Sequence, residues 1–244
     1  MSTLEVKKLT GGYHPTIPTV RDVSVSVRSG ETVAIIGPNG AGKSTFIKAI
    51  FGLCVVHGGE VVLDGVDLCG MATSKLVSYG LGYVPQVNNV FPGMTVRENL
   101  EMGGFLRRKE VPERIDEVSV IFPDLHAALS RKAEELSGGQ RNMLALARAL
   151  MTSPAFVLLD EPTAGLSPIY VDRVWEQVRR VADAGVGVLI VEQNARRALE
   201  NADQGLVLVE GRVALSRPAH ELLHSSEVVA LYLGGEGASV PTVA

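Results

Sequence analysis

The stretch TVAIIGPNGAGKSTFIKAI, residues 32–50, contains an apolar run, a glycine-rich turn and a helical pattern in direct succession. The run at 32–37 is continuous and apolar, as expected of a strand buried on both faces. Apolar residues then recur at three- and four-residue spacings from Phe46 to Phe51, which predicts a helix. The turn GPNGAGKST, residues 37–45, therefore lies where a buried strand ends and a helix begins.

This turn fits the pattern G-x-x-x-x-G-K-[ST], whose glycines let backbone N–H groups point at phosphate oxygens. The helix start adds a favourable field for anions. Lys43 is expected to reach the β and γ phosphates of a triphosphate, and the Ser44 hydroxyl to bind Mg²⁺. The alternative, a glycine-rich turn that binds nothing, explains the pattern and its context less well. The predicted cofactor-binding residues here are Gly37, Pro38, Asn39, Gly40, Ala41, Gly42, Lys43, Ser44 and Thr45.

A second metal ligand is predicted in AFVLLDEP, residues 155–162. Asp160 ends an apolar strand, so its carboxylate emerges at the carboxyl edge of the sheet, where α/β proteins bind ligands. We expect it to hold Mg²⁺ through water, and we expect Glu161 to orient or deprotonate a water that attacks the γ-phosphate. An Asp-Glu pair alone is usually a solvated turn, but this pair follows a buried strand downstream of a phosphate-binding turn.

The rest of the chain predicts an α/β fold. Apolar strands at 155–160 and 185–192 alternate with helices, which implies a mainly parallel sheet covered by helices on both faces. VRDVSVSVR, residues 20–28, alternates valine with polar residues, as in a sheet with one wet face. Residues 205–215 predict a hairpin that turns at Glu210-Gly211. Helical periodicity dominates residues 87–150, which interrupt the α/β pattern.

Composition narrows the classes of function. The 244 residues are 46% hydrophobic, enough for a sizeable core, and the net charge of −4 with a pI near 5.8 argues against a nucleic-acid partner. Cys54 and Cys69 are too few for a disulfide framework or a metal cluster, and are expected as small buried or half-buried residues in a reducing compartment. No apolar run reaches the roughly 18 residues of a spanning helix. We expect a soluble or peripheral protein of the cytosol.

LSGGQRNMLALARAL, residues 136–150, begins a predicted helix with two glycines, although glycine is a poor helix former. Together with Gly37–Thr45 and Phe156–Pro162, in this order, Leu136–Gln140 resembles the nucleotide-binding subunit of ATP-binding cassette (ABC) transporters over nearly the whole chain. LSGGQ is the signature sequence of that family. The resemblance implies an ATP hydrolase with a P-loop NTPase core, an N-terminal antiparallel β-subdomain and an inserted helical subdomain, using ATP and Mg²⁺.

The resemblance also implies one domain over 1–244. The core would comprise residues 1–86 and 151–233, the helical signature subdomain 87–150, and a flexible tail 234–244. Thr95 and Glu98, near the start of the helical subdomain, form a capping-box pattern.

The resemblance explains why two glycines begin this predicted helix. In the family, two subunits pack head to tail, and each signature helix covers the triphosphate held by the other P-loop. Without side chains, backbone N–H groups can approach a γ-phosphate closely, while Ser137 caps the helix and donates its hydroxyl. Whether the partner is a second copy or a sister subunit stays open. The residues implied are Ser137, Gly138, Gly139 and Gln140.

Two further positions match motifs of the family, and two others depart from them. Gln86 matches the glutamine that contacts Mg²⁺ or the attacking water, although alone it would be an ordinary loop residue. Tyr13 matches the aromatic residue that stacks on adenine, although it could simply be half-buried. Gln193 replaces the usual switch histidine, so it can donate a hydrogen bond to γ-phosphate but cannot become a cation. Slower hydrolysis at this site is one consequence to consider, and a partner subunit that carries the histidine is the alternative. Ser167 stands where an aspartate is common, and its neutral hydroxyl would alter cross-talk between the two sites.

These departures, with VFPGMTVRENLEMGGFLRR at 90–108, resemble one of the two ATPase subunits of branched-chain amino-acid importers, a type that also serves urea or short-amide uptake. Such importers imply two membrane permease subunits, a solute-binding protein and a location at the cytoplasmic face of the inner membrane. In NNVFPGM, residues 88–94, we hypothesise that Val90, Phe91 and Met94 receive a coupling helix of a permease. The alternative is that they pack inside the helical subdomain.

Three rival functions share part of this evidence. A lipid or drug exporter ATPase would carry the same ATP motifs. A soluble ABC ATPase acting on ribosomes or DNA would be expected to have two cassettes or a coiled-coil insertion, and the chain shows neither. A non-catalytic binding module is disfavoured by intact Lys43, Asp160 and Glu161, although Gln193 keeps it open.

Overall fold

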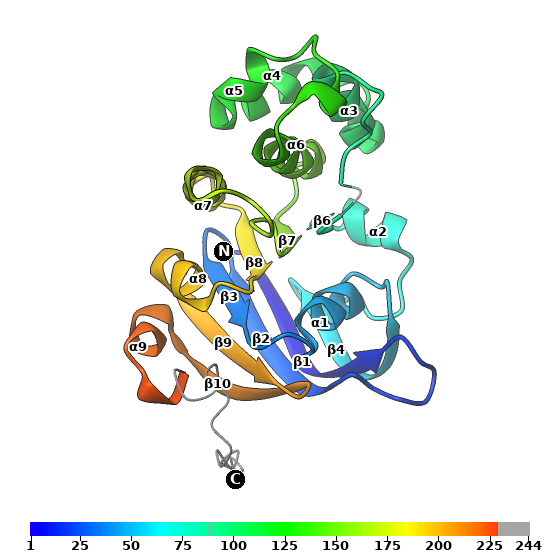
Figure 1. Cartoon of the computed structure of the whole chain (residues 1–244). Coiled ribbons are helices and arrows are strands. Elements are labelled where there is room, and N and C mark those ends of the chain that lie inside the picture. Colours follow the sequence, from blue (N-terminus) through cyan, green and yellow to red (C-terminus); the bar gives the residue numbers. More distant parts are fainter. Residues whose placement is uncertain (88, 229–244) are drawn as a thin grey trace.

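The computed structural model describes residues 1–87 and 89–228. Figure 1 shows two β-sheets in the lower part of the molecule and a group of helices, α3 to α6, in the upper part. The tail predicted at 234–244 and Asn88 of the NNVFPGM segment lie outside the described residues. Within them, no helix combines the length and apolar character needed to cross a membrane.

The larger sheet has six strands in the order β10-β9-β3-β8-β7-β6. All its neighbours pair in parallel except the β9–β10 hairpin, which turns at Glu210-Gly211 as predicted, both with positive φ. The mainly parallel sheet expected from the apolar runs is confirmed. Its strands are β3 (Thr32–Ile36), β6 (Leu81–Val84), β7 (Phe156–Asp160), β8 (Gly187–Val191), β9 (Gln204–Val209) and β10 (Arg212–Pro218).

The smaller sheet is antiparallel, in the order β2-β1-β4-β5. Its strand β4 begins at Val55 and contains Gly58 and Gly59, which lie near a register shift against β1. The strands are β1 (Thr3–Gly12), β2 (Val20–Arg28), β4 (Val55–Leu63) and β5 (Val66–Asp67).

The core lies on both faces of the larger sheet. Val33 and Ile35 of β3 face a cluster that lies between the two sheets and includes the apolar face of α1 (Lys43–Ile50). Ala34 and Ile36 face the opposite cluster, which includes residues of α6 and α7. Successive residues of one strand therefore point to two buried faces, which explains why its sequence is continuously apolar.

The remaining helices are mostly short. The Thr95–Glu98 capping box is confirmed at the start of α3, which ends at Gly103. Three helices were not predicted: α2 (Thr73–Ser78), α8 (Ala195–Asn201) and α9 (Ala219–Leu223). The others are α3 (Val96–Gly103), α4 (Val111–Ile121), α5 (Pro123–His126), α6 (Gly138–Leu150) and α7 (Pro168–Asp183).

Candidate functional site

The predicted phosphate-binding turn joins the buried strand β3 to α1. Gly42 is the N-cap of α1 and has a left-handed conformation, with φ of 95°. A Cβ atom there would also come within 2.8 Å of the Val20 side chain. Glycine is therefore required at this position by both conformation and space. Asn39 and Gly40 lie exposed at the tip of the turn, while Ala41 is buried beneath it.

Lys43 lies along the inside of this turn. Its side chain is buried, and Nζ donates to the carbonyl oxygens of Gly37 at 2.8 Å and Pro38 at 3.2 Å. Burial lowers the pKa of this ammonium, an effect opposed by the charges of Glu161, Glu192 and Asp160. The turn thus holds a positive charge at its centre. Ser44 is half-buried at the second position of α1, and the neighbouring Thr45 is buried.

Asp160 ends β7 with its side chain almost fully buried. One oxygen, Oδ2, accepts from the Tyr83 hydroxyl at 3.3 Å and lies 3.8 Å from Lys48 Nζ. The other oxygen, Oδ1, is buried and has no hydrogen-bond partner. A buried carboxylate oxygen without a partner is costly unless a cation or its bound water meets it. Asp160 Oδ1 therefore suits the metal-binding role expected from the sequence.

The composition of the site favours Mg²⁺ over a metal caged by protein. Over residues 1–87 and 89–228, no group of three His, Cys, Asp or Glu side chains is arranged to hold a metal ion. Mg²⁺ typically uses one or two protein oxygens together with substrate phosphates and water. Ser44 and Asp160 fit such a partial ligand set.

Glu161 and Gln86, both predicted as site residues, lie in contact. Gln86 Nε2 donates to Glu161 Oε2 at 2.9 Å. Glu161 has a positive φ of 48°, and its N–H donates to the Val191 carbonyl at 3.0 Å, which ties the residue to the end of β8. An unusual backbone conformation of this kind often occurs where a side chain is held for function.

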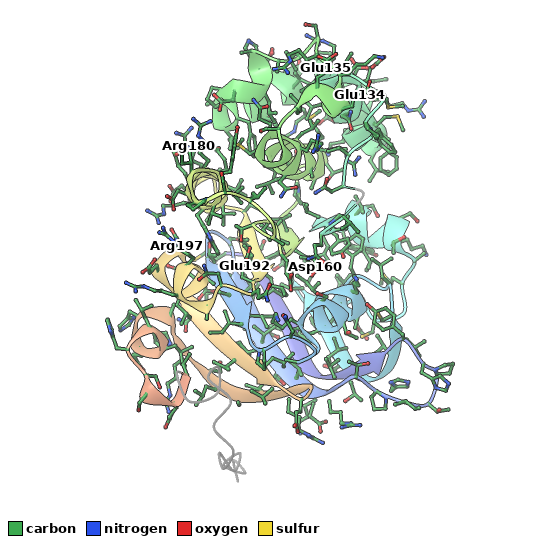
Figure 2. All side chains as sticks on the ribbon, viewed as in Figure 1. Glu134, Glu135, Asp160, Arg180, Glu192 and Arg197 are labelled. Carbon is green, nitrogen blue, oxygen red and sulfur yellow. The ribbon has the colours of Figure 1, made fainter. Side chains whose placement is uncertain are left out.

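Glu192 was not predicted as part of the site. It directly follows β8, is 2% exposed, and accepts from the Thr163 hydroxyl at 2.8 Å and the Thr163 N–H at 3.1 Å. Burial raises the pKa of Glu192 to about 7, although these hydrogen bonds oppose the shift. The available signal was its place after a buried strand, the same place that Asp160 has after β7. Figure 2 shows Asp160 and Glu192 at the same edge of the sheet.

Gln193, the predicted replacement for the switch histidine, follows Glu192 with an exposed side chain, and its N–H donates to Glu192 Oε2 at 3.3 Å. Tyr13, the predicted adenine contact, is also exposed, at 61%. Its hydroxyl accepts from Lys48 Nζ at 3.4 Å. Lys48 therefore lies between the predicted adenine contact and Asp160, and it too was missed by sequence reasoning.

The signature segment forms the start of α6. Ser137 is the N-cap: its hydroxyl accepts from Gln140 N–H at 3.3 Å, and Gln140 Oε1 accepts from Ser137 N–H at 3.0 Å. The expected capping role of Ser137 is confirmed. Figure 1 shows α6 in the upper, helical part and α1 in the lower part, with β6 and β7 between them. The two predicted phosphate-binding segments therefore occupy separate places in one chain.

The two signature glycines differ in their surroundings. Gly138 is exposed, and the nearest atom to an added Cβ would be a Leu166 methyl at 3.6 Å, an ordinary contact. Gly139 is buried, and an added Cβ would lie 2.2 Å from the Tyr170 ring. The expectation that both glycines serve only a close approach to phosphate is thus incomplete. Gly139 is also required by packing between α6 and α7.

Comparison with known proteins agrees with the motifs. The family model described as ABC transporter matches residues 20–164. The chain is 40% identical to the "Probable branched-chain amino acid transport ATP-binding protein LivF" of Archaeoglobus fulgidus, covering 95% of this chain and 98% of that one. The chain belongs to the ABC transporter family. As a member, it is an ATP hydrolase with the P-loop fold.

Other relatives of this ABC ATPase include a second branched-chain amino acid transport protein and an export protein. The high-affinity branched-chain amino acid transport ATP-binding protein BraG of Pseudomonas aeruginosa is 40% identical, covering 91% of this chain and 96% of its own. The lipopolysaccharide export protein LptB of Escherichia coli is 33% identical, covering 96% and 98%. A solved ATP-binding cassette of an ABC transporter in its ADP conformation has 29% identity and a TM-score of 0.84, covering 96% and 99%.

The difference between the signature glycines is testable by substitution. Gly139→Ala should destabilise the fold by about 1–3 kcal/mol, because the added methyl group overpacks against Tyr170. Gly138→Ala should change stability by less than about 0.5 kcal/mol, since the site is exposed. Urea unfolding would measure both. Adding Tyr170→Ala should remove most of the loss of stability caused by Gly139→Ala. If the Gly139→Ala protein is as stable as the unmodified protein, the packing of Gly139 against Tyr170 is not the constraint described.

Proposed function

We propose that this ABC ATPase binds and hydrolyses Mg·ATP to energise a membrane importer, with branched-chain amino acids as the solute class. The observation that carries the ATP part is the convergence of Lys43, the unpartnered Asp160 Oδ1 and Glu161 at one edge of the sheet. The carboxyl ends of β3, β7 and β8 meet there, because β8 pairs with both other strands.

Each side chain has a proposed task at this edge. Lys43 binds the β and γ phosphates, with the backbone of Gly37–Thr45 around them, and Tyr13 stacks on adenine. Ser44 and Asp160 hold Mg²⁺, with Gln86 as a further contact. When bound, Mg²⁺ would neutralise part of the negative charge of the phosphates.

Glu161 orients the attacking water and accepts its proton. Its contact with Gln86 at 2.9 Å places the amide beside the base. Gln193 donates to the γ-phosphate. Because Gln193 cannot carry a positive charge, we expect turnover to be slower than with histidine at this position.

The separation of α6 from α1 supports a head-to-tail dimer. In the proposed arrangement, Ser137, Gly138, Gly139 and Gln140 of one subunit cover the triphosphate held by the other. In this arrangement the proposed helical subdomain, residues 87–150, carries the signature segment, and the proposed core comprises residues 1–86 and 151–233. The partner is a second copy or a related ATPase subunit.

A substitution at Glu161 tests the dimer. Glu161→Gln should hold ATP without hydrolysing it, so the protein should sediment as a dimer with Mg·ATP and as a monomer with Mg·ADP. Adding Ser137→Arg should restore the monomer, because the long side chain occupies the phosphate-facing end of α6. If the Glu161→Gln protein stays monomeric with Mg·ATP, both alone and with an ATPase subunit that co-purifies from its host, the proposed arrangement is wrong.

The proposed solute class rests on the names of similar proteins and on their identity to this chain. Two similar proteins named for branched-chain amino acid transport share 40% identity with this chain, against 33% for an LptB. We therefore favour import over the alternatives, which are a urea or amide importer and a lipid exporter. A soluble, non-transport ABC ATPase is a weaker alternative. The proposed partners are two membrane permeases and, indirectly, a solute-binding protein, which places the chain at the cytoplasmic face of the membrane.

A groove beside β6 supports contact with a permease. It has a volume of about 540 Å³ and is lined by residues of both the proposed core and the proposed helical subdomain. Phe91 is 43% exposed there and stacks against the Arg148 guanidinium, 4.8 Å from the ring centre. Val90 and Met94 are half-buried, so only Phe91 of the three hypothesised contacts is openly exposed. Side chains lining the groove include Phe51, Tyr83, Phe91, Met102, Phe105 and Arg148.

Charge at Phe91 tests this contact. Phe91→Glu should lower solute uptake by at least about tenfold in membranes that contain the permeases from the host, because it removes an exposed aromatic anchor. Basal ATP hydrolysis should stay within about twofold, since Phe91 lies outside the proposed ATP site. Val120→Glu, an exposed apolar residue on α4 outside this groove, is the matched control and should leave uptake unchanged. Normal uptake by Phe91→Glu would remove the hypothesis.

A further inference from the structure

Tyr83 lies between the groove and the proposed metal site. It is the third residue of β6, and its ring stacks on Phe51 with centroids 5.1 Å apart and planes inclined by 28°. Its hydroxyl donates to Asp160 Oδ2 at 3.3 Å. Both rings also line the groove beside β6. One side chain therefore contacts two places that the proposed function assigns to different ligands.

The Tyr83 contact determines which oxygen of Asp160 remains available. Oδ2 is met by the Tyr83 hydroxyl and by Lys48 Nζ at 3.8 Å. Oδ1 is left buried and without a partner. The hydrogen bond from Tyr83, together with the ion pair to Lys48, restricts rotation of the carboxylate, so the orientation of the other oxygen is set as well.

Tyr83 can act as the donor in this contact, because an ordinary tyrosine hydroxyl keeps its proton at neutral pH. Its hydrogen bond to a carboxylate is charge-assisted, a stronger type than one between neutral groups.

We propose that Tyr83 is a positioning residue that holds Asp160 so that Oδ1 meets Mg²⁺ or its bound water. The inference rests on the proposed role of Asp160 in binding Mg²⁺.

A simpler role for Tyr83 would be to fill space beside Phe51. The two roles differ in what the hydroxyl does. Tyr83→Phe keeps the ring, its stacking and its contribution to the groove, and removes only the donor to Asp160. A space-filling residue would tolerate this change, whereas a positioning residue would not.

The test measures binding of the ATP analogue AMP-PNP by calorimetry, in EDTA and over a series of Mg²⁺ concentrations. In Tyr83→Phe the Mg²⁺ concentration for half-maximal tightening should rise about tenfold, in line with the loss of a group that orients a metal ligand. Affinity in EDTA and the thermal midpoint should match the unmodified protein. Tyr79→Phe, an exposed tyrosine at the end of α2, is the matched control and should behave as the unmodified protein.

A second substitution distinguishes the proposed metal role of Asp160 from the proposed positioning role of Tyr83. Asp160→Asn should weaken the Mg²⁺ effect further, and adding Tyr83→Phe to it should cause no additional shift, because Tyr83 acts through Asp160. If Asp160→Asn changes the Mg²⁺ dependence and Tyr83→Phe does not, the positioning role is wrong while the metal role stands. If Asp160→Asn also has no effect, both fail. Equal weakening in EDTA and in Mg²⁺ would identify a general defect and overturn the positioning role.

Discussion

The predicted site residues of this chain come together because three parallel strands end at one edge of one sheet. β8 pairs with β3 on one side and with β7 on the other, with Val191 opposite both Ile35 and Asp160. The predicted phosphate-binding turn follows β3, Asp160 ends β7 and Glu161 follows it, and Glu192 follows β8. Parallel pairing therefore places groups distant in sequence around one small volume.

The strand β6 extends this arrangement toward the helices. It pairs with β7 and carries Tyr83 to Asp160, and Gln86 just beyond it reaches Glu161. Tyr83 lies within β6, and Gln86 lies between β6 and the helices α3 to α6. The same strand thus connects the acidic pair to the groove, which gives the proposed coupling between ATP and a permease a short route through side chains rather than a long one through the core.

Sequence patterns predicted the sheet, the P-loop and the start of α6, because each depends on local order: apolar runs, a fixed motif and a capping box. They did not predict α2, α8 or α9, which at six, seven and five residues are too short for helical periodicity to emerge. They also missed Glu192, Tyr83 and the Tyr170 contact of Gly139. These depend on which strands and helices become neighbours, and a single sequence does not show that.

Direct titration of AMP-PNP and Mg²⁺ into Lys43→Met tests whether this edge of the sheet binds the triphosphate. Lys43 is the only side chain whose ammonium lies inside the turn in the part of the chain that the structure describes. The affinity should fall about 10- to 100-fold while the thermal midpoint of the nucleotide-free protein is retained, because a buried charge partner of the phosphates is lost. Lys75→Met, at an exposed lysine of α2, should bind normally. Undiminished affinity in a folded Lys43→Met protein would show that the triphosphate binds elsewhere.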